Sequence, residues 1–277
     1  MFKIIFVSIF IVISFNSAFA KTQASRVING NQLKGSQLAA MAKLSWTDSD
    51  GNERICSATL IGPRTIITAA HCVKNSQLGL ITNQTFGPIG GKTYAVKLQI
   101  HPNYRMALNY PQSFALINDI AIGTVNKDIT NVTPATVSSR LPNVGDRILF
   151  AGTGQPSFNR AYGFSQVFML GNLGLTQRAL NGAKKQAADH GDSGGPNFIL
   201  DANQRIYLIG VNSTSTGTKD MTDELGWDIL KPYTQGTALI WPQTAAGTQT
   251  YLQQFVRSTS AQVCGINRTC APLTTPY

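Results

Sequence analysis

Ser193 has neighbours that leave one hydroxyl group open to attack a substrate. It lies in the stretch DHGDSGGP, residues 189–196, between Asp192 and two glycines, with a proline beyond them. A serine in an ordinary turn does not need these surroundings. A serine that attacks a carbonyl carbon does, because it needs open approach and backbone N–H groups that can face the developing negative charge. The stretch therefore predicts a nucleophilic serine.

A serine nucleophile needs a base to take its proton, and the chain has three histidines. His71 follows TIITAA, a β-branched strand that runs into small residues, and Cys72 could clamp that strand end. A rigid strand end suits a base that must be held accurately. His101 lies in a turn, HPNY, and His190 is so near Ser193 on an extended chain that the two side chains should point apart. We therefore expect His71 to be the base.

A carboxylate should orient that base, and Asp119 is the candidate. It lies in INDIAIGTV, an apolar run typical of a strand. A buried carboxylate is unfavourable unless it is hydrogen-bonded, and an imidazole N–H would satisfy it. The same bond would fix the tautomer of the histidine. The chemistry predicted for the three residues is nucleophilic attack by serine, assisted by a base and its acid.

Short strands are the elements that must position these residues. Runs rich in Val, Ile, Thr and Phe alternate with turn residues and with almost no long helical periodicity: TLIG, TIITAA, YAVKLQI, IAIGTV, RILFAG, SQVFML and RIYLIGV. This pattern predicts an all-β fold, either two barrels or one large sandwich at this length. Near the end, TYLQQFVRS has helical spacing and predicts a short amphipathic helix over 251–257.

The first twenty residues resemble a leader for export. Lys3 precedes a long apolar run that ends in Ala18-Phe19-Ala20, the pattern of a cleaved signal peptide. A membrane anchor is the alternative, but the run is short for a span and a cleavage site follows it. We expect cleavage after Ala20, no stable membrane anchor, and a secreted protein, or a periplasmic one if the source is bacterial.

Charge and cysteines narrow the function classes further. The 277 residues carry a formal net charge of +10, spread without the basic, aromatic-rich cluster of a nucleic-acid site. We expect no nucleic-acid partner.

The four cysteines, Cys56, Cys72, Cys264 and Cys270, allow three disulfide pairings, and their grouping favours Cys56–Cys72 and Cys264–Cys270. They lack paired C-x-x-C spacing, which argues against a zinc site. The sequence shows no other metal-ligand cluster, and we expect neither a metal nor a cofactor.

Three motifs together resemble one family. TAAHC, NDIAI and GDSGGP occur in the order His, Asp, Ser, as in the chymotrypsin/trypsin family of serine endopeptidases. RVINGN at 26–31 resembles the family's activation junction, CSATLIGPRTIITAAHC contains the two cysteines that the family bridges, and GDRILFAGTG resembles the opening strand of its second barrel. The resemblance covers roughly residues 27–257. It implies two six-stranded antiparallel β-barrels, about 27–136 and 137–257, with the active site between them. Residues 258–277 are left as a tail with a small disulfide loop.

The resemblance also implies roles. His71 would be general base and then general acid, Asp119 would orient it, and Ser193 would form an acyl-enzyme. The N–H groups of Gly191 and Ser193 would form the oxyanion hole, and glycine suits the backbone twist required there.

Activation by cleavage is a further implication. Residues 21–26 would be a short propeptide, and cleavage after Arg26 would free an amine on Val27 that pairs with Asp192. The secreted form would then be a zymogen. Asp192 as a plain turn residue is the simpler alternative. Because the substrate pocket does not look trypsin-like, we expect a different protease to cut at Arg26.

The chain departs from the family at the residues that choose substrates. Ala187 stands at the base of the expected specificity pocket, where trypsin-like members have an acid. Asp189 replaces the usual cysteine, and Ser213 and Ser215 stand on a further wall without the usual Trp-Gly. Asp189 could enter the pocket and favour basic residues, although a solvated carboxylate is energetically simpler. His190 stands at the rim, where it would contact either substrate or solvent.

The sequence thus predicts a secreted, monomeric serine endopeptidase that acts on proteins or peptides. A non-catalytic relative that uses the same fold for binding is the alternative. Such relatives typically lack a member of the triad or an oxyanion glycine, and this chain has all of them. An esterase of another fold would need G-x-S-x-G with histidine last, which the sequence lacks.

Overall fold

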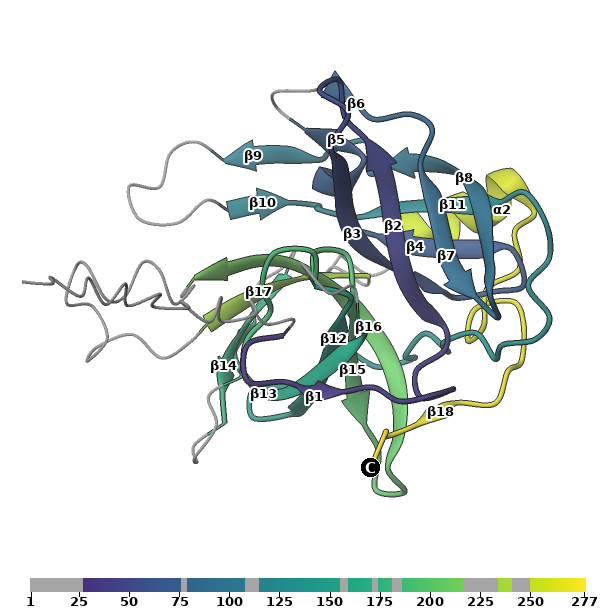
Figure 1. The fold of residues 1–277 in the computed structure, drawn as a ribbon. Helices are drawn as coiled ribbons and strands as arrows, with labels where there is room; N and C mark the ends of the chain where they lie inside the picture. Colours follow the sequence, from purple (N-terminus) through teal and green to yellow (C-terminus); the bar gives the residue numbers. More distant parts are fainter. Residues whose placement is uncertain are drawn as a thin grey trace, which may run out of the picture.

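The structure is a computed structural model that describes residues 27–75, 79–107, 115–154, 159–170, 174–180, 186–216, 234–240 and 250–277. The expected leader (1–20) and the expected propeptide (21–26), with Arg26, lie outside the described residues. Antiparallel strands form two groups that follow one another along the chain (Figure 1). Within the described ranges, no helix has both the length and the apolar character needed to cross a membrane.

Six antiparallel strands close the first barrel in the order β11-β4-β3-β2-β7-β8. They are β2 (Met41–Thr47), β3 (Glu53–Leu60), β4 (Thr65–Thr68), β7 (Thr85–Ile89), β8 (Lys92–Ile100) and β11 (Ala121–Val125). Their apolar side chains fill the interior, where Leu44, Leu60, Ile66, Phe86 and Ile122 are fully buried. Outside this ring, β5 (Lys74–Asn75) pairs with β6 (Gly79–Leu80), and β9 (Arg105–Ala107) pairs with β10 (Ala115–Ile117).

The second barrel is also a closed ring of six antiparallel strands. Around the ring the order is β13-β12-β15-β16-β17-β14, and β14 pairs again with β13. The strands are β12 (Arg147–Gly152), β13 (Ala161–Leu170), β14 (Gly174–Ala179), β15 (Pro196–Leu200), β16 (Arg205–Thr216) and β17 (Thr234–Leu239). Two short strands add to its edges, β1 (Asn31–Gln32) on β13 and β18 (Leu273–Thr274) on β16. The expected all-β class with two six-stranded barrels is confirmed.

A short helix, α2 (Tyr251–Thr259), follows the second barrel and returns to the first. Thr250 begins it with a capping box, in which its hydroxyl accepts from the Gln253 N–H and the Gln253 side chain accepts from the Thr250 N–H. Leu252 and Phe255 are buried, and the Tyr251 hydroxyl donates to the carbonyl of Gln99 in β8 at 2.8 Å. The expected C-terminal helix is confirmed, with two more residues than the sequence pattern gave.

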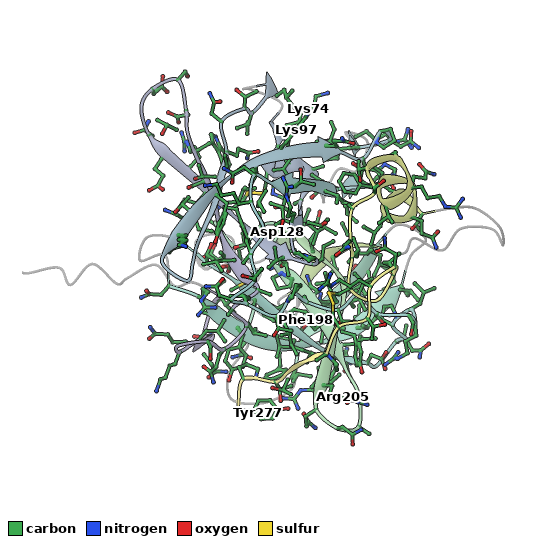
Figure 2. All side chains as sticks on the ribbon, turned by 90° about the vertical axis from the view of Figure 1, so that its right-hand side faces the viewer. Lys74, Lys97, Asp128, Phe198, Arg205 and Tyr277 are labelled. Atoms are coloured by element: carbon green, nitrogen blue, oxygen red, sulfur yellow. A yellow bond between two sulfur atoms is a disulfide. The ribbon has the colours of Figure 1, made fainter. Side chains whose placement is uncertain are left out.

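The tail beyond the helix runs from one barrel to the other. Cys264 donates its N–H to the Ile61 carbonyl in the first barrel, and β18 pairs with Arg205 and Ile206 in the second. Figure 2 shows Tyr277 and Arg205 together at the end of the second barrel, away from Lys74 and Lys97 on the first. Cys264 and Cys270 are bonded, so the expected small loop is present.

Candidate active site

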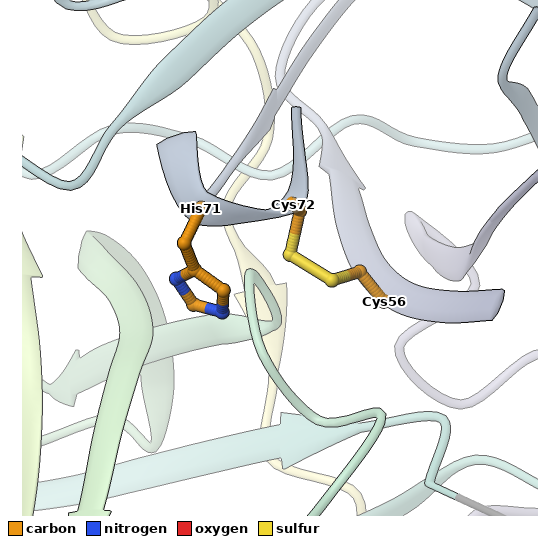
Figure 3. A group of neighbouring side chains, drawn as sticks. All are labelled: Cys56, His71 and Cys72. Carbon is orange, nitrogen blue, oxygen red and sulfur yellow. A yellow bond between two sulfur atoms is a disulfide. The ribbon is translucent and has the colours of Figure 1, made fainter. Parts of the chain in front are cut away.

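His71 is held by a short turn that is fastened on both sides. β4 ends at Thr68, and His71 lies in a single turn of 3-10 helix, Ala70–Cys72, rather than in the strand itself. Cys72 is bonded to Cys56 of β3, as the grouping of the cysteines predicted, which ties the turn to the barrel (Figure 3). Ala69 and Ala70 are fully buried, so the small residues before the histidine let the turn pack against the core.

The carboxylate of Asp119 holds the His71 side chain in place. Its Oδ2 lies 2.7 Å from His71 Nδ1, and its Oδ1 accepts the His71 backbone N–H at 2.8 Å. Asp119 is fully buried and lies two residues before β11. Because a carboxylate only accepts, Nδ1 carries the proton, and Nε2 of a neutral ring is left as an acceptor. The structure therefore brings together two of the three residues predicted to act as a unit, in the tautomer that a base requires.

Ser213 contacts the same carboxylate, which the sequence did not suggest. Its hydroxyl donates to Asp119 Oδ2 at 2.6 Å. The pairing of β16 with β17 shifts register between Asn212 and Thr214, so Ser213 is the extra residue of a bulge. Bulges re-aim side chains, and this one directs the hydroxyl to the acid. The predicted role of Ser213 in a specificity pocket stays a prediction, and its observed contact is with the acid.

The same contacts change the pKa of the imidazole. Burial lowers the pKa of His71, but the negative charge of Asp119 and the hydrogen bond to Nδ1 raise it by more, so the net pKa lies above 6.5. The His71 side chain is 25% exposed, so the ring is covered without being sealed from solvent. A raised pKa means that the neutral, proton-accepting form of the ring becomes available at a higher pH than for an ordinary histidine.

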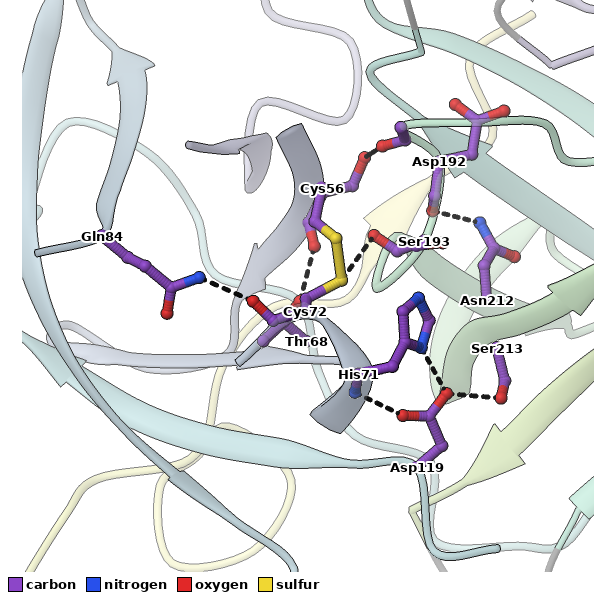
Figure 4. Close-up of a disulfide and its surroundings, with 12 residues drawn as sticks. Cys56, Thr68, His71, Cys72, Gln84, Asp119, Asp192, Ser193, Asn212 and Ser213 are labelled. Atoms are coloured by element: carbon purple, nitrogen blue, oxygen red, sulfur yellow. Dashed lines mark hydrogen bonds and ion pairs between the residues drawn. A yellow bond between two sulfur atoms is a disulfide. The ribbon is translucent and has the colours of Figure 1, made fainter. Parts of the chain in front are cut away.

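Ser193 sits in a glycine loop that is fastened to the first barrel. Its carbonyl accepts the N–H of Ser57 in β3 at 2.7 Å, and Figure 4 shows Ser193 and Asp119 on opposite sides of the His71 ring. Gly194 has φ +78°, and a Cβ there would lie 2.1 Å from Thr68 Oγ1. Only glycine therefore allows the loop to pack this closely on β4.

Two backbone N–H groups of this loop remain available. Among the described residues, neither the Gly191 N–H nor the Ser193 N–H has a hydrogen-bond partner. Gly191 has φ +90°, a conformation that favours glycine. Its carbonyl instead accepts the hydroxyl of Ser57 at 2.8 Å. Unpaired N–H groups beside a partly exposed serine are donors that an oxyanion could use.

Asp192 lies in a fully buried pocket of N–H donors. Its Oδ2 accepts from Val27 at 2.9 Å and from Asp189 at 2.9 Å, and its Oδ1 accepts from Gly154 at 3.0 Å. Burial raises the pKa of Asp192 to about 7, the three N–H donors lower it, and the charge of Asp189 adds to the rise. In the intact chain, Val27 contributes a peptide N–H. An ammonium at the same position would neutralise the buried charge.

The predicted specificity residues lie in different environments. Ala187 is buried, and its carbonyl accepts the Ile28 N–H at 2.7 Å. Asp189 is half-buried and accepts the N–H of His190, whose side chain is exposed. The backbone of Ser215 pairs with Gln235 in β17. The role of each in substrate selection stays a prediction.

The Cys56, His71 and Cys72 side chains form a cluster with the donor types of a zinc site. Their ligand atoms lie within 4.8 Å of one another. Both sulfurs are joined in the disulfide (Figure 3), and zinc needs thiolates. The oxidised cluster therefore braces the histidine and is not a metal centre.

Comparison with known proteins agrees with this geometry. The trypsin family model matches residues 27–224. Chymase from Cavia porcellus is 29% identical over 45% of this chain and 48% of its own length. Human kallikrein-4 is 24% identical over 52% of this chain and 56% of its own, and human kallikrein-5 is 27% identical over 62% and 63%. The chain thus spans about half to three fifths of these relatives. With two six-stranded barrels, a carboxylate-held histidine and a serine in a glycine loop, the chain belongs to the trypsin-like serine protease family.

Proposed function

We propose that the chain is a secreted serine endopeptidase that hydrolyses peptide bonds through an acyl-enzyme. The observation that carries the proposal is the set of bonds on Asp119, which fix His71 with Nδ1 protonated and Nε2 open. The N–H groups of Gly191 and Ser193, which have no partner among the described residues, support it as donors for the oxyanion. The family match supports a hydrolase, and the identity of the reacting residues is our inference.

The first half of the reaction transfers the substrate acyl group to the enzyme. His71 Nε2 takes the proton of the Ser193 hydroxyl as Oγ bonds to the carbonyl carbon. The carbonyl electrons move to oxygen, and the N–H groups of Gly191 and Ser193 stabilise the resulting negative charge. The imidazolium, stabilised by Asp119, then gives its proton to the leaving amine as the C–N bond breaks.

The second half returns the enzyme to its starting state. A water molecule gives a proton to His71 Nε2 and attacks the acyl carbon, and the same N–H groups bind the second oxyanion. Collapse breaks the bond to Ser193 Oγ, which recovers its proton from His71. This chemistry uses only side chains and backbone of the chain and requires no cofactor.

Regulation by cleavage is part of the proposal. Removal of residues 21–26 would convert the Val27 N–H, now 2.9 Å from Asp192 Oδ2, into an ammonium at the same buried carboxylate. Because Ala187 gives the expected pocket no acid, we propose that a different protease performs the cut after Arg26. We expect protein or peptide substrates whose residue before the scissile bond is not selected by a charge at Ala187.

Covalent labelling tests the proposal most directly. The purified protein would be treated with a fluorophosphonate before and after limited trypsin cleavage, with Ser193→Ala as the matched control. We expect labelling that depends on Ser193 and begins only after cleavage at Arg26. Labelling of the uncleaved chain would contradict the zymogen part alone. Failure to label folded, cleaved protein would contradict the enzyme and favour a binding module.

A further inference from the structure

Three side-chain amides lie inside the second barrel, where apolar groups are the usual filling. They belong to Gln177 of β14, Asn197 of β15 and Asn212 of β16, and their exposed fractions are 0%, 0% and 3%. Buried amides are unfavourable unless their hydrogen bonds are made. Three at the centre of one barrel therefore need a reason beyond packing.

The amides form a connected row across the barrel. Gln177 Nε2 donates to Asn197 Oδ1 at 2.6 Å, and Asn197 Nδ2 donates to Asn212 Oδ1 at 2.8 Å. β14 and β15 are three steps apart in either direction around the ring, so the first of these bonds crosses the interior. The hydroxyl of Ser165 donates to Gln177 Oε1, and Gln177 Nε2 also donates to Thr237 Oγ1, which anchors the far end.

The row ends on the glycine loop that holds Ser193. Asn212 Nδ2 donates to the Asp192 carbonyl at 3.0 Å and to the Ala151 carbonyl of β12 at 2.9 Å. The Asn212 backbone holds the next residues, because its carbonyl accepts from Gly194 at 2.8 Å and its N–H donates to Gly195 at 2.8 Å. Each amide in the row has an N–H that donates towards the loop, and bonds aligned in one direction polarise and strengthen one another.

The Asp192 carbonyl matters because of the peptide bond to which it belongs. That bond joins Asp192 to Ser193, and in a planar trans peptide the N–H points opposite to the C=O. The carbonyl is fixed by Asn212 Nδ2 and by the Gly195 N–H at 2.9 Å. A fixed carbonyl sets the direction of the Ser193 N–H, which has no partner among the described residues.

We propose that Asn212, braced through Asn197 and Gln177, is a positioning residue that aims the Ser193 N–H at the developing oxyanion. The proposal rests on the proposed function, since that N–H is one of the two donors inferred there. The hydrogen bonds of the Asn212 side chain go to Asn197, Ala151 and the Asp192 carbonyl. It therefore acts through the Asp192–Ser193 peptide. Gln177 and Asn197 keep the Asn212 amide in the orientation that presents N–H groups, and not an oxygen, to the two carbonyls.

The test uses cleaved protein with three variants that keep side-chain size and remove hydrogen bonds: Asn212→Leu, Asn197→Leu and Gln177→Met. Ile199→Val is the control, because Ile199 lies in β15, is equally buried and belongs to an apolar cluster. With a small activated ester as substrate, we expect Asn212→Leu to lower kcat about 10- to 100-fold at nearly constant KM. The loss should be smaller than the roughly 100- to 1000-fold typical of a deleted donor, because the N–H is misdirected and not removed. Asn197→Leu and Gln177→Met should give progressively smaller losses.

Amide hydrogen exchange over residues 191–195 provides a readout that needs no catalysis. We expect faster exchange in the row variants than in wild type and in Ile199→Val. If wild type proves inactive but exchange is still faster in the row variants than in wild type, the proposed function fails and the positioning of the loop stands. Unchanged exchange in folded row variants overturns the inference, whether or not kcat falls. A Gln177→Met effect on both readouts would support it even if Asn212→Leu does not fold.

Discussion

At the scale of single residues, the protonation of His71 should govern the rate. In the proposed mechanism His71 must be neutral to accept a proton, and its pKa lies above 6.5 because of Asp119. We therefore expect the rate of fluorophosphonate labelling to rise with pH through a midpoint above 6.5 and then level off. In Asp119→Asn the charge is lost while burial, which lowers the pKa, remains. The midpoint should then fall, and the rate should drop steeply because an amide no longer fixes the required tautomer.

The measurement is a pH series of labelling rates on both proteins. Tyr104 is also shifted by this carboxylate: burial and then the Asp119 charge raise the pKa of Tyr104 to about 12. The titration of Tyr104 therefore falls above the pH range of the series and cannot imitate that of His71. An unchanged midpoint in Asp119→Asn would show that another group controls the profile.

Ser57 is a second residue whose substitution should lower the stability of the fold. Its fully buried hydroxyl donates to the Gly191 carbonyl at 2.8 Å and accepts the Thr153 N–H at 2.9 Å, so it joins the glycine loop to both barrels. Ser57→Ala would leave both backbone groups unpaired, at about 1–3 kcal/mol each. We expect a loss of at least about 2 kcal/mol in the free energy of unfolding by urea. The control is Ser45→Ala, whose half-buried hydroxyl contacts Thr85 Oγ1 and should matter much less.

At the scale of elements, loss of either disulfide should lower stability, but only loss of the first should also slow labelling. Cys56–Cys72 spans 16 residues and Cys264–Cys270 spans 6, so loop closure predicts losses of about 3 and 2 kcal/mol when each pair is changed to alanine. Only the first bond fixes the turn that carries His71. We expect its loss to slow labelling as well, while the second variant labels at the wild-type rate. Equal labelling by both variants would mean that the turn is held well enough by Asp119.

The sequence predicted the strands and motifs better than it predicted the supporting polar contacts. Runs such as RILFAG and RIYLIGV lie in β12 and β16 because β-branched residues fit a half-buried pleated surface. The contact between His71 and Asp119 could be predicted because the neighbours of both residues are distinctive. Asn197 and Gln177 were not, since an amide in a strand ordinarily faces solvent. Only closure of the ring places these two inside, and closure depends on strand pairing across the whole domain.

At the scale of the whole molecule, the tail that follows α2 contacts both barrels. Cys264 donates its N–H to the Ile61 carbonyl and accepts the Val137 N–H at 2.9 Å, and β18 then joins the second barrel. The Pro276 carbonyl accepts from Gln37 at 2.5 Å, near the start of the first barrel. These contacts link the two barrels, and the proposed function requires His71 on the first barrel to meet Ser193 on the second to within a fraction of an ångström.

Cleavage at the N-terminus should also change the stability of the whole molecule. In the intact chain the pKa of Asp192 is raised from 3.8 to about 7, chiefly by burial. The folded state therefore holds a proton that the unfolded state releases between these values. Stability must fall as pH rises across that window. The shift corresponds to about 4 kcal/mol at neutral pH, which the intact chain loses relative to acid.

The ammonium of a cleaved chain should remove this loss, because a positive charge beside the carboxylate returns its pKa towards the ordinary range. We expect cleaved protein to exceed the intact chain in free energy of unfolding by several kcal/mol at pH 7.5, and the gap to narrow towards pH 4. Both forms would carry Ser193→Ala to prevent self-digestion, and Arg26→Gln would keep one of them intact during urea unfolding at each pH. Asp192→Asn provides the matched control in the intact chain, since an amide has no proton to lose and the fall in stability between pH 4 and 7.5 should disappear. A gap that stays constant from pH 4 to 7.5 would assign the gain to the freed chain end and not to the buried charge.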